Sequence, residues 1–209
     1  MSLNLTQIAV TPKAGRPLFA PLTLVISPGQ VATVMGPSGI GKSTLLDAIG
    51  GHLAQGFTVS GQAVLNGQDL LTLPAEARRV GVLFQDALLF PHLSVGDNLA
   101  FGLAQSVTGR ARKEAVDQAL EQAGLAGFAA RDPATLSGGQ RARAALMRAL
   151  LAKPLALLLD EPFSRLDADL RAEIRRFVFD HVRAQNIPAL MVTHDASDAD
   201  AAGGPVVTL

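Results

Sequence analysis

The chain has 209 residues and lacks cysteine, tyrosine and tryptophan altogether. Without cysteine it can form neither a disulfide framework nor a cysteine-ligated metal site, and this composition is compatible with the cytosol. Acidic and basic residues balance, since 18 lysines and arginines stand against 18 aspartates and glutamates. The net charge of zero offers no global electrostatic basis for binding nucleic acid or an anionic membrane, so no nucleic-acid partner is expected.

Long apolar runs are also missing. The longest stretches, such as residues 155–159, are far shorter than the roughly 20 residues that a membrane-spanning helix needs. Asn4, Thr6 and Gln7 interrupt the segment where a signal peptide would be apolar. The length predicts one large α/β domain, and if the chain serves a membrane process, another chain must cross the bilayer.

A glycine-rich loop is the most informative motif that the chain does contain. It matches the phosphate-loop pattern and reads Gly36-Pro37-Ser38-Gly39-Ile40-Gly41-Lys42-Ser43-Thr44. A strand is expected before it and a helix after it, so glycine backbone and helix start together point N–H groups at an anion. We expect Lys42 to bind the β- and γ-phosphates, Ser43 to bind Mg²⁺ and Thr44 to reach the α-phosphate. A glycine-rich turn that binds nothing is the alternative.

A second segment ends in two carboxylates. The apolar run at residues 155–159 is typical of a buried strand, and Asp160 and Glu161 follow it directly. Beside a phosphate loop, Asp160 is expected to bind Mg²⁺ directly or through water. Glu161 would then orient or deprotonate an attacking water. Standing alone, such a pair would more simply cap a helix.

A third segment reads Leu136-Ser137-Gly138-Gly139-Gln140 and leads into a helix with an apolar stripe. Ser137 and Gln140 have the spacing of a capping box. Gly138 and Gly139 leave the start of the helix bare, which makes it a second anion site. One chain thus carries two helix starts that are suited to phosphate.

Periodicity and turn signals predict an α/β fold. Strands are expected at residues 3–10, 22–26, 31–35, 62–65, 80–84, 155–159, 189–192 and 206–209, and helices at 42–50, 110–123 and 168–185. Asn66-Gly67 predicts a tight turn, and Gly124 predicts a helix C-terminus. The first strands are expected to form a small antiparallel layer beside a doubly wound sheet, with a helical insert after residue 85.

These motifs together resemble the ATP-binding subunit of an ABC transporter, over nearly the whole chain. The loop at 36–44 matches that family's phosphate loop, residues 136–140 its signature and residues 155–161 its magnesium-and-base strand. Phe84-Gln85 matches the glutamine loop, residues 164–167 the loop after the base, and residues 192–195, which include His194, the histidine switch. More narrowly, residues 84–90 and 160–167 resemble bacterial importer subunits.

The resemblance implies the phosphate-loop NTPase fold of ABC ATPases, with a mostly parallel core sheet, an antiparallel β layer and a helical subdomain. It implies one ATPase domain over residues 1–209, in which residues 1–85 and 155–209 form the nucleotide-binding core and residues 86–154 the helical subdomain with the signature. The implied activity is hydrolysis of ATP to ADP and phosphate, coupled to transport.

The implied cofactors are ATP and Mg²⁺. Two copies would pack head to tail, so that each ATP lies between one phosphate loop and the partner copy's signature, residues 137–140. By similarity, Gln85 would ligate Mg²⁺ and report the nucleotide state to the helical insert. His194 would contact the γ-phosphate and hold the water and Glu161 in line, although a hydrogen-bonded histidine at a strand end is the alternative.

The implied partners are integral-membrane permease subunits, a second copy of the chain and, indirectly, a solute-binding protein. The chain would therefore be cytoplasmic and peripheral on the inner face of the membrane. Residues 88–93 would line the groove for a cytoplasmic helix of the permease, with insert core as the alternative; we expect part of this run to be buried and part exposed.

Three segments depart from the family pattern: the region of the adenine-stacking residue, Arg165 in the loop after the base, and residues 195–204. Where the family stacks adenine on an aromatic residue, this chain offers Phe19, which is equally suited to the core, or Arg16, so ATP and GTP are both open. Arg165 replaces a small residue near the expected dimer seam and either pairs across it or points into solvent. Asp167 is expected to contact the other subunit or to cap a helix. Residues 195–204 are short, and regulation by a C-terminal extension is expected to be absent.

Other classes of function remain open at this point. A soluble ABC-type ATPase acting on ribosomes or DNA usually carries two such domains or long coiled coils, and this chain has neither. A module that binds nucleotide without hydrolysing it would not need Glu161. A phosphoryl-transferring kinase would have no use for residues 136–140.

Overall fold

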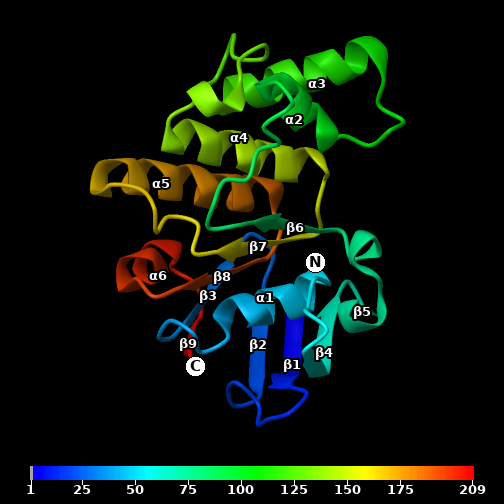
Figure 1. Cartoon of the computed structure of the whole chain (residues 1–209), viewed down its shortest axis with the longest axis vertical. Helices are drawn as coiled ribbons and strands as arrows, with labels where there is room; N and C mark the ends of the chain where they lie inside the picture. The colour runs from blue at the N-terminus through cyan, green and yellow to red at the C-terminus, as the bar shows by residue number, and fades with distance from the viewer. Residues whose placement is uncertain (1) are drawn as a thin grey trace. The chain divides into compact units, whose positions relative to one another are not determined.

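The computed structural model describes residues 2–209 (Figure 1). They form two compact units, which are described one at a time. The first unit comprises the residues up to Val82, Leu155–Glu161 and Phe179–Leu209, and the second comprises Leu83–Pro154 and Pro162–Val178. In this described part of the chain, no helix is both long and apolar enough to cross a bilayer.

The first unit contains a five-stranded sheet in the order β6-β7-β8-β3-β9. These strands are β6 (Val80–Leu83), β7 (Ala156–Asp160), β8 (Ala189–Thr193), β3 (Val31–Met35) and β9 (Val206–Thr208). The pairs β7–β8, β8–β3 and β3–β9 are parallel, with Ala189 opposite both Leu157 and Val31. Strand β8 is buried along its whole length, as expected for a central parallel strand. The predicted α/β class with a mostly parallel core sheet is confirmed.

A second, antiparallel sheet has the order β2-β1-β4-β5. It consists of β1 (Leu3–Pro12), β2 (Leu22–Ile26), β4 (Phe57–Leu65) and β5 (Gln68–Asp69). The register between β1 and β4 shifts between Thr6 and Ala9. At this bulge Gly61 has a φ of 91°, and a Cβ there would lie 2.3 Å from the carbonyl oxygen of Gln7. Only glycine therefore fits at this crossing of the two strands.

The predicted strand at 62–65 is thus too short, since β4 begins at Phe57. The predicted Asn66-Gly67 turn is confirmed: φ is 52° at Asn66 and 79° at Gly67, and the turn joins β4 to β5.

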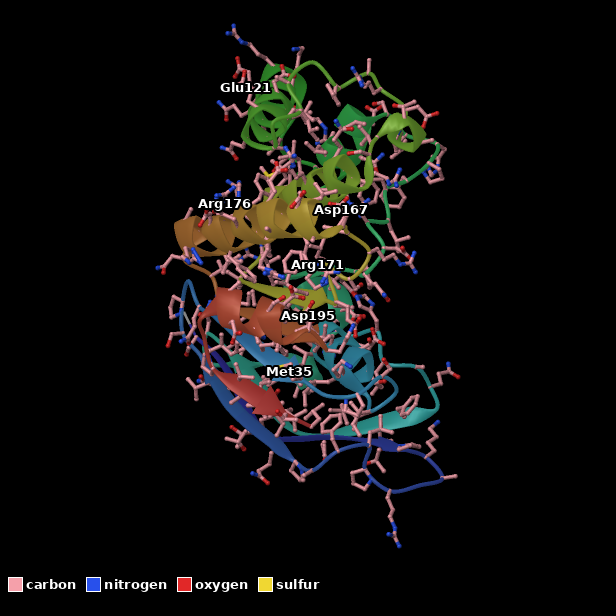
Figure 2. All side chains as sticks on the ribbon, turned by 90° about the vertical axis from the view of Figure 1, so that its left-hand side faces the viewer. Met35, Glu121, Asp167, Arg171, Arg176 and Asp195 are labelled. Atoms are coloured by element: carbon pink, nitrogen blue, oxygen red, sulfur yellow. The ribbon has the colours of Figure 1, made fainter. Side chains whose placement is uncertain are left out.

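Helix α1 (Lys42–Gly50) carries the residues that follow the phosphate loop. Its buried side chains include Leu45, Leu46 and Ile49, which pack in one core with strands of both sheets. The unit also contains two short 3₁₀ helices (Leu70–Thr72 and Ala75–Ala77), the end of α5 (Ala168–Gln185) from Phe179 onwards, and α6 (Ala196–Ala202). Asp195 caps α6 (Figure 2), and the brevity of this helix agrees with the prediction for residues 195–204.

The second unit is helical. It contains α2 (Val95–Phe101), α3 (Gly109–Gln122), a 3₁₀ turn (Pro133–Thr135), α4 (Gly138–Leu151) and the start of α5 (Ala168–Gln185). Its core joins α2, α3 and α4 through buried side chains that include Leu99, Leu120 and Met147. Gly124 has a φ of 65° just beyond α3, as predicted for a helix C-terminus.

Within the segment 88–93, Leu88 is 58% exposed, whereas Leu89 packs against the core of the second unit. The expected mixture of covered and exposed residues is therefore observed.

Candidate nucleotide site

The phosphate loop joins β3 to α1 in the first unit. Gly39 and Gly41 have φ values of 84° and 106°, which favour glycine. A Cβ on Gly41 would also lie 2.8 Å from the Leu18 side chain, which would have to move to accommodate a larger residue. Gly41 is the N-cap of α1, and no side chain of the described residues caps this helix. Its first N–H groups and its dipole are therefore directed at the loop, an arrangement suited to an anion.

The remaining loop residues are arranged around this turn. Pro37 and Ser38 are exposed, and Thr44 is half-buried at the first turn of α1. Ile40 is also half-buried, and a Cβ added to Gly36 would lie 3.1 Å from its side chain. The exposed rim and the packed base leave the backbone of the loop as the surface offered to a ligand.

Lys42 is the buried cation of this site, with 5% of its surface exposed. Its Nζ donates to the carbonyl oxygens of Gly36 at 2.7 Å and Pro37 at 3.1 Å. The same Nζ lies 3.6 Å from Oε1 of Glu161. The ammonium group is thus held inside the loop, at the position where a phosphate would be bound.

Asp160 ends β7 and accepts a hydrogen bond from Oγ of Ser43 at 2.9 Å. Burial raises the pKa of the Asp160 carboxyl, and the Ser43 bond opposes that rise; Glu161 and Asp47 raise it further, while Lys42 lowers it. A cation bound beside this carboxylate would relieve the cost of its burial.

The oxygens of Ser43 and Asp160 fit Mg²⁺, which prefers hard oxygen ligands and usually takes only one or two of them from protein. Over residues 2–209, no cluster of three or more histidine, cysteine or acidic side chains forms a metal cage. When bound, Mg²⁺ would supply positive charge to neutralise phosphate groups.

Glu161 follows directly and has a φ of 43°, a strained conformation for a residue with a side chain. Its backbone N–H donates to the carbonyl oxygen of Val192 in β8 at 3.0 Å, which helps to fix this turn. Its Oε2 lies 3.0 Å from Nδ1 of His194, and its Oε1 faces Lys42. The Glu161 carboxylate therefore lies between the Lys42 ammonium group and the His194 imidazole.

These side chains converge because β3, β7 and β8 are neighbouring parallel strands. Parallel strands end at one edge of a sheet, and the loop after β3, the Asp160–Glu161 pair after β7 and His194 after β8 all leave from that edge. Ligands of open α/β sheets bind at this edge. The structure thus brings together the predicted site residues that belong to the first unit.

The other predicted site residues belong to the second unit. Ser137 is the N-cap of α4: Gln140 N donates to Ser137 Oγ at 3.3 Å, and Ser137 N donates to Gln140 Oε1 at 2.9 Å. The predicted capping box is therefore present. Gly138 is half-buried and Gly139 buried, and a Cβ on Gly139 would lie 2.5 Å from the Leu170 side chain. A larger residue there would displace the Leu170 side chain of α5.

Gln85 is exposed and donates from Nε2 to Oγ of Ser164 at 3.2 Å. Next to it, Asp86 forms an ion pair with Arg165. Neither expectation for Arg165, a contact across a dimer seam or free solvation, includes this partner. The signal that could have predicted it is an acid directly after Gln85 and an unusual cation in the loop after Glu161.

Asp167 lies at the start of α5 (Figure 2), where its Oδ1 accepts from the N–H of Leu170 at 3.0 Å. It therefore acts as a helix cap, and a contact with another subunit stays a prediction. Phe19 is 6% exposed and belongs to the core of the first unit, whereas Arg16 is exposed. Of the two roles predicted for Phe19, the structure favours the core.

Comparison with known proteins agrees with this geometry. The ABC transporter family profile matches residues 19–164. An uncharacterized ABC transporter ATP-binding protein, YnjD of Escherichia coli (strain K12), is 53% identical over 88% of this chain and 85% of its own length. A dimeric post-hydrolysis structure of the ATP-binding cassette MJ0796, bound to ADP and Pi, superposes with a TM-score of 0.80 at 29% identity, covering 99% of this chain and 94% of that one.

Named importer subunits are also similar. The Fe(3+) ions import ATP-binding protein FbpC of Mannheimia succiniciproducens is 41% identical over 90% of this chain, and the sulfate/thiosulfate import ATP-binding protein CysA of Gloeobacter violaceus is 46% identical over 86%. The chain spans only 53% and 52% of the lengths of these two relatives.

Fold, phosphate loop and carboxylate pair define a nucleotide-binding ATPase domain of the phosphate-loop class. Within that class, the chain belongs to the ABC transporter family, as an ATP-binding domain.

Proposed function

We propose that this chain hydrolyses ATP with Mg²⁺ and energises a bacterial ABC importer. The observation that carries the proposal is the position of Glu161. Its backbone is strained, and its carboxylate lies between Lys42 and His194 beside the phosphate loop. A domain that only bound nucleotide would need the loop but not this carboxylate. The importer direction is supported by the similarity to the iron import protein FbpC and the sulfate/thiosulfate import protein CysA.

In this proposal the residues of the first unit divide the work. The N–H groups of residues 36–44 and the Lys42 ammonium bind the phosphates, while Ser43 and Asp160 hold Mg²⁺. Glu161 accepts a proton from the attacking water while the oxygen of that water forms a bond to the γ-phosphorus. The bond between the γ-phosphorus and the β–γ bridging oxygen breaks, and ADP leaves. His194 orients that carboxylate through the 3.0 Å contact and contacts the γ-phosphate. Gln85 would contribute a further oxygen ligand to Mg²⁺.

A second copy completes the reaction chamber. The start of α4 is suited to the phosphates bound by another copy, because its two glycines have no side chains to cover the N-terminal N–H groups. This segment consists of Ser137, Gly138, Gly139 and Gln140. The dimeric form of the MJ0796 structure supports such an arrangement. Since the closed dimer would bind ATP more tightly than the open one, ATP shifts the population towards closure and hydrolysis reverses the shift.

Residues 1–85 and 155–209 would then act as the nucleotide-binding core and residues 86–154 as the helical subdomain. The partners would be permease subunits, which place the chain on the cytoplasmic face of a membrane, and indirectly a solute-binding protein. Action on ribosomes or DNA is the less favoured alternative, because the FbpC and CysA relatives are named for import.

Light scattering of the Glu161→Gln protein tests the shared site. With saturating ATP and Mg²⁺ this variant should bind nucleotide, lose turnover and show twice the monomer mass, because the closed dimer cannot hydrolyse its ATP and reopen. The matched control is Lys42→Ala, which should remain at monomer mass because it fails to bind the phosphates. A monomer in the Glu161→Gln sample, with ATP demonstrably bound, would contradict the shared-site proposal.

A further inference from the structure

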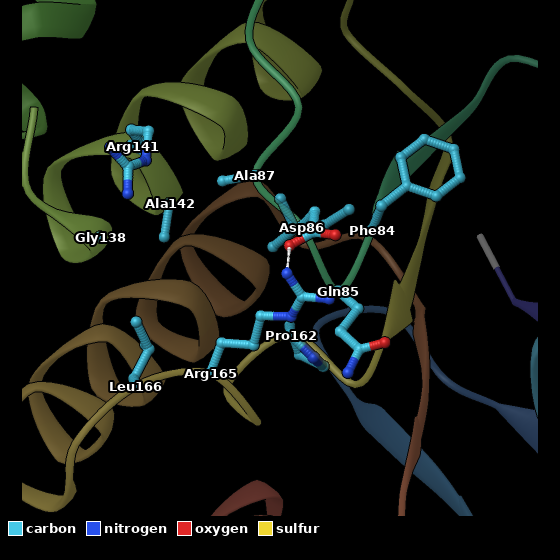
Figure 3. Close-up of a pocket in the computed structure, with 11 residues that line it drawn as sticks. Phe84, Gln85, Asp86, Ala87, Gly138, Arg141, Ala142, Pro162, Arg165 and Leu166 are labelled. Atoms are coloured by element: carbon cyan, nitrogen blue, oxygen red, sulfur yellow. Dashed lines mark ion pairs between the residues drawn. The ribbon is translucent and has the colours of Figure 1, made fainter. Parts of the chain in front are cut away.

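Two loops of the second unit are joined side chain to side chain (Figure 3). One follows β6 and carries Gln85 and Asp86; the other begins just after Glu161 and carries Ser164 and Arg165. Gln85 Nε2 donates to Ser164 Oγ at 3.2 Å, and the carboxylate of Asp86 pairs with the guanidinium of Arg165. Consecutive residues of one loop thus contact consecutive residues of the other.

The loops line a cavity of about 260 Å³ together with the first turn of α4. Among the described residues around it, Asp86 is the one acid, and Arg141 and Arg165 are the two bases. Arg141 is committed to the carbonyl oxygen of Leu136 at 2.7 Å. Arg165 is therefore the cation that pairs with Asp86.

We propose that the Asp86–Arg165 ion pair is a positioning pair that fixes Gln85 against the loop following Glu161. This inference rests on the proposed function, in which Gln85 is a magnesium ligand and Glu161 the base. The Gln85–Ser164 bond is a single, exposed, neutral hydrogen bond, which contributes little by itself. The neighbouring ion pair restricts both loops at the adjacent residues and so orients Gln85.

The expected effects fall on turnover rather than on folding. Both partners are well exposed, at 62% for Arg165 and 48% for Asp86, and exposed ion pairs contribute little to global stability. Misplacing a reacting group by about 1 Å can cost up to about a hundredfold in rate. We therefore expect loss of the pair to lower kcat by about tenfold and to raise the Mg²⁺ requirement similarly, with an unchanged melting temperature.

The test compares Asp86→Asn, Arg165→Gln and the charge-swapped double variant Asp86→Arg/Arg165→Asp. The control is Glu114→Gln, which removes the exposed Arg110–Glu114 ion pair of α3 in the same unit. Each protein is assayed for kcat, for the Mg²⁺ concentration giving half-maximal rate, and for melting temperature. Both single variants should lose turnover, the swap should recover most of it, and the control should match the parent.

A second readout does not depend on ATPase activity. The chain has no tryptophan, and Phe84, 41% exposed, precedes Gln85, so Phe84→Trp places one fluorophore on the loop. In the Phe84→Trp background, acrylamide quenching of tryptophan fluorescence should rise about twofold in the single variants, because the loop becomes more mobile. In the charge-swapped double variant, quenching should return to the level of the Phe84→Trp parent, because the ion pair is restored.

The outcomes separate the two proposals. If the parent hydrolyses no ATP but quenching changes and recovers as expected, the proposed function fails and the pair still holds the loop. If quenching is the same in all variants, or the swap behaves no better than the single variants, the ion pair does not position the loop. Changed quenching with an unchanged kcat would also overturn the positioning role.

Discussion

A buried arginine at the far end of the phosphate-loop helix yields a quantitative prediction. Arg78 is 8% exposed and donates from Nη1 to the carbonyl oxygens of Ala48 at 2.7 Å and Ile49 at 2.8 Å, in the last turn of α1. Its Nε donates to the carbonyl oxygen of Leu73 at 3.0 Å. Carbonyls in the last turn of a helix have no partner within the helix, so the guanidinium satisfies groups that would otherwise be left buried and unpaired.

The cost of Arg78→Met follows from these bonds. Hydrogen bonds to a charged donor contribute about 1.5–3 kcal/mol each, which gives a gross loss of about 4.5–9 kcal/mol for the three. Burial lowers the pKa of Arg78, with Asp69 opposing the shift, so removing the charge recovers part of its desolvation cost. We expect a net loss of about 3 kcal/mol, or a fall in melting temperature of about 6–12 °C.

Thermal unfolding of the nucleotide-free protein, followed by far-ultraviolet circular dichroism, measures this fall. The matched control is Arg16→Met, which removes an exposed arginine from the same unit and should change the melting temperature by less than about 2 °C. Arg78→Lys should lie between the parent and Arg78→Met, because an ammonium group cannot reproduce the planar set of donors. Equal melting temperatures for Arg78→Met and Arg16→Met would refute the reasoning.

Three further predictions concern the nucleotide motifs. Burial raises the pKa of Asp160, so ionising this carboxyl costs more in the folded than in the unfolded chain, and the free energy of unfolding should fall as the pH rises above 3.8, the ordinary pKa of aspartate. Asp160→Asn should reduce this fall, as measured by urea unfolding between about pH 4 and pH 7. Ser137→Ala should cost about 1 kcal/mol of unfolding free energy by removing the cap of α4, and Ser137→Asp should restore most of it. Lys42→Ala should abolish measurable ATP binding by calorimetry, since it removes the single full charge that the loop directs at the phosphates.

Local patterns predict local structure well. The strand, loop and helix at residues 31–50 and the capping box of Ser137 and Gln140 depend on neighbours within four or five residues, so their spacing alone is informative. The exception is β4, whose first five residues the sequence does not reveal. There, Gly61 leaves one of the alternating apolar positions of β4 without a side chain, and the residues around it, Ser60 and Gln62, are polar and exposed, so the segment does not show the signal on which strand prediction depends.

Long-range pairings are where sequence reasoning ends. Arg78 donates to two carbonyl groups about 30 positions earlier in the chain, and Asp86 pairs with Arg165 about 80 positions later. From the sequence alone, such a charged residue is predicted to be a solvated side chain, because the neighbouring residues carry no information about a distant partner. Phe19 is similar, since an aromatic residue near a predicted base site and an aromatic residue in the core look alike until burial is known.

The contacts of Lys42 connect nucleotide binding to the chemistry that Glu161 is proposed to perform. A buried ammonium group must be satisfied, and here the carbonyls of Gly36 and Pro37 and the Glu161 carboxylate satisfy it. At 3.6 Å, the gross attraction between the two charges is about 5 kcal/mol at an effective dielectric constant of about 20. A triphosphate brings more negative charge than one carboxylate, so it competes for the lysine and weakens this attraction. In the proposed mechanism, Glu161 would then keep its 3.0 Å contact with His194 and would become available as the base only when the phosphates have bound.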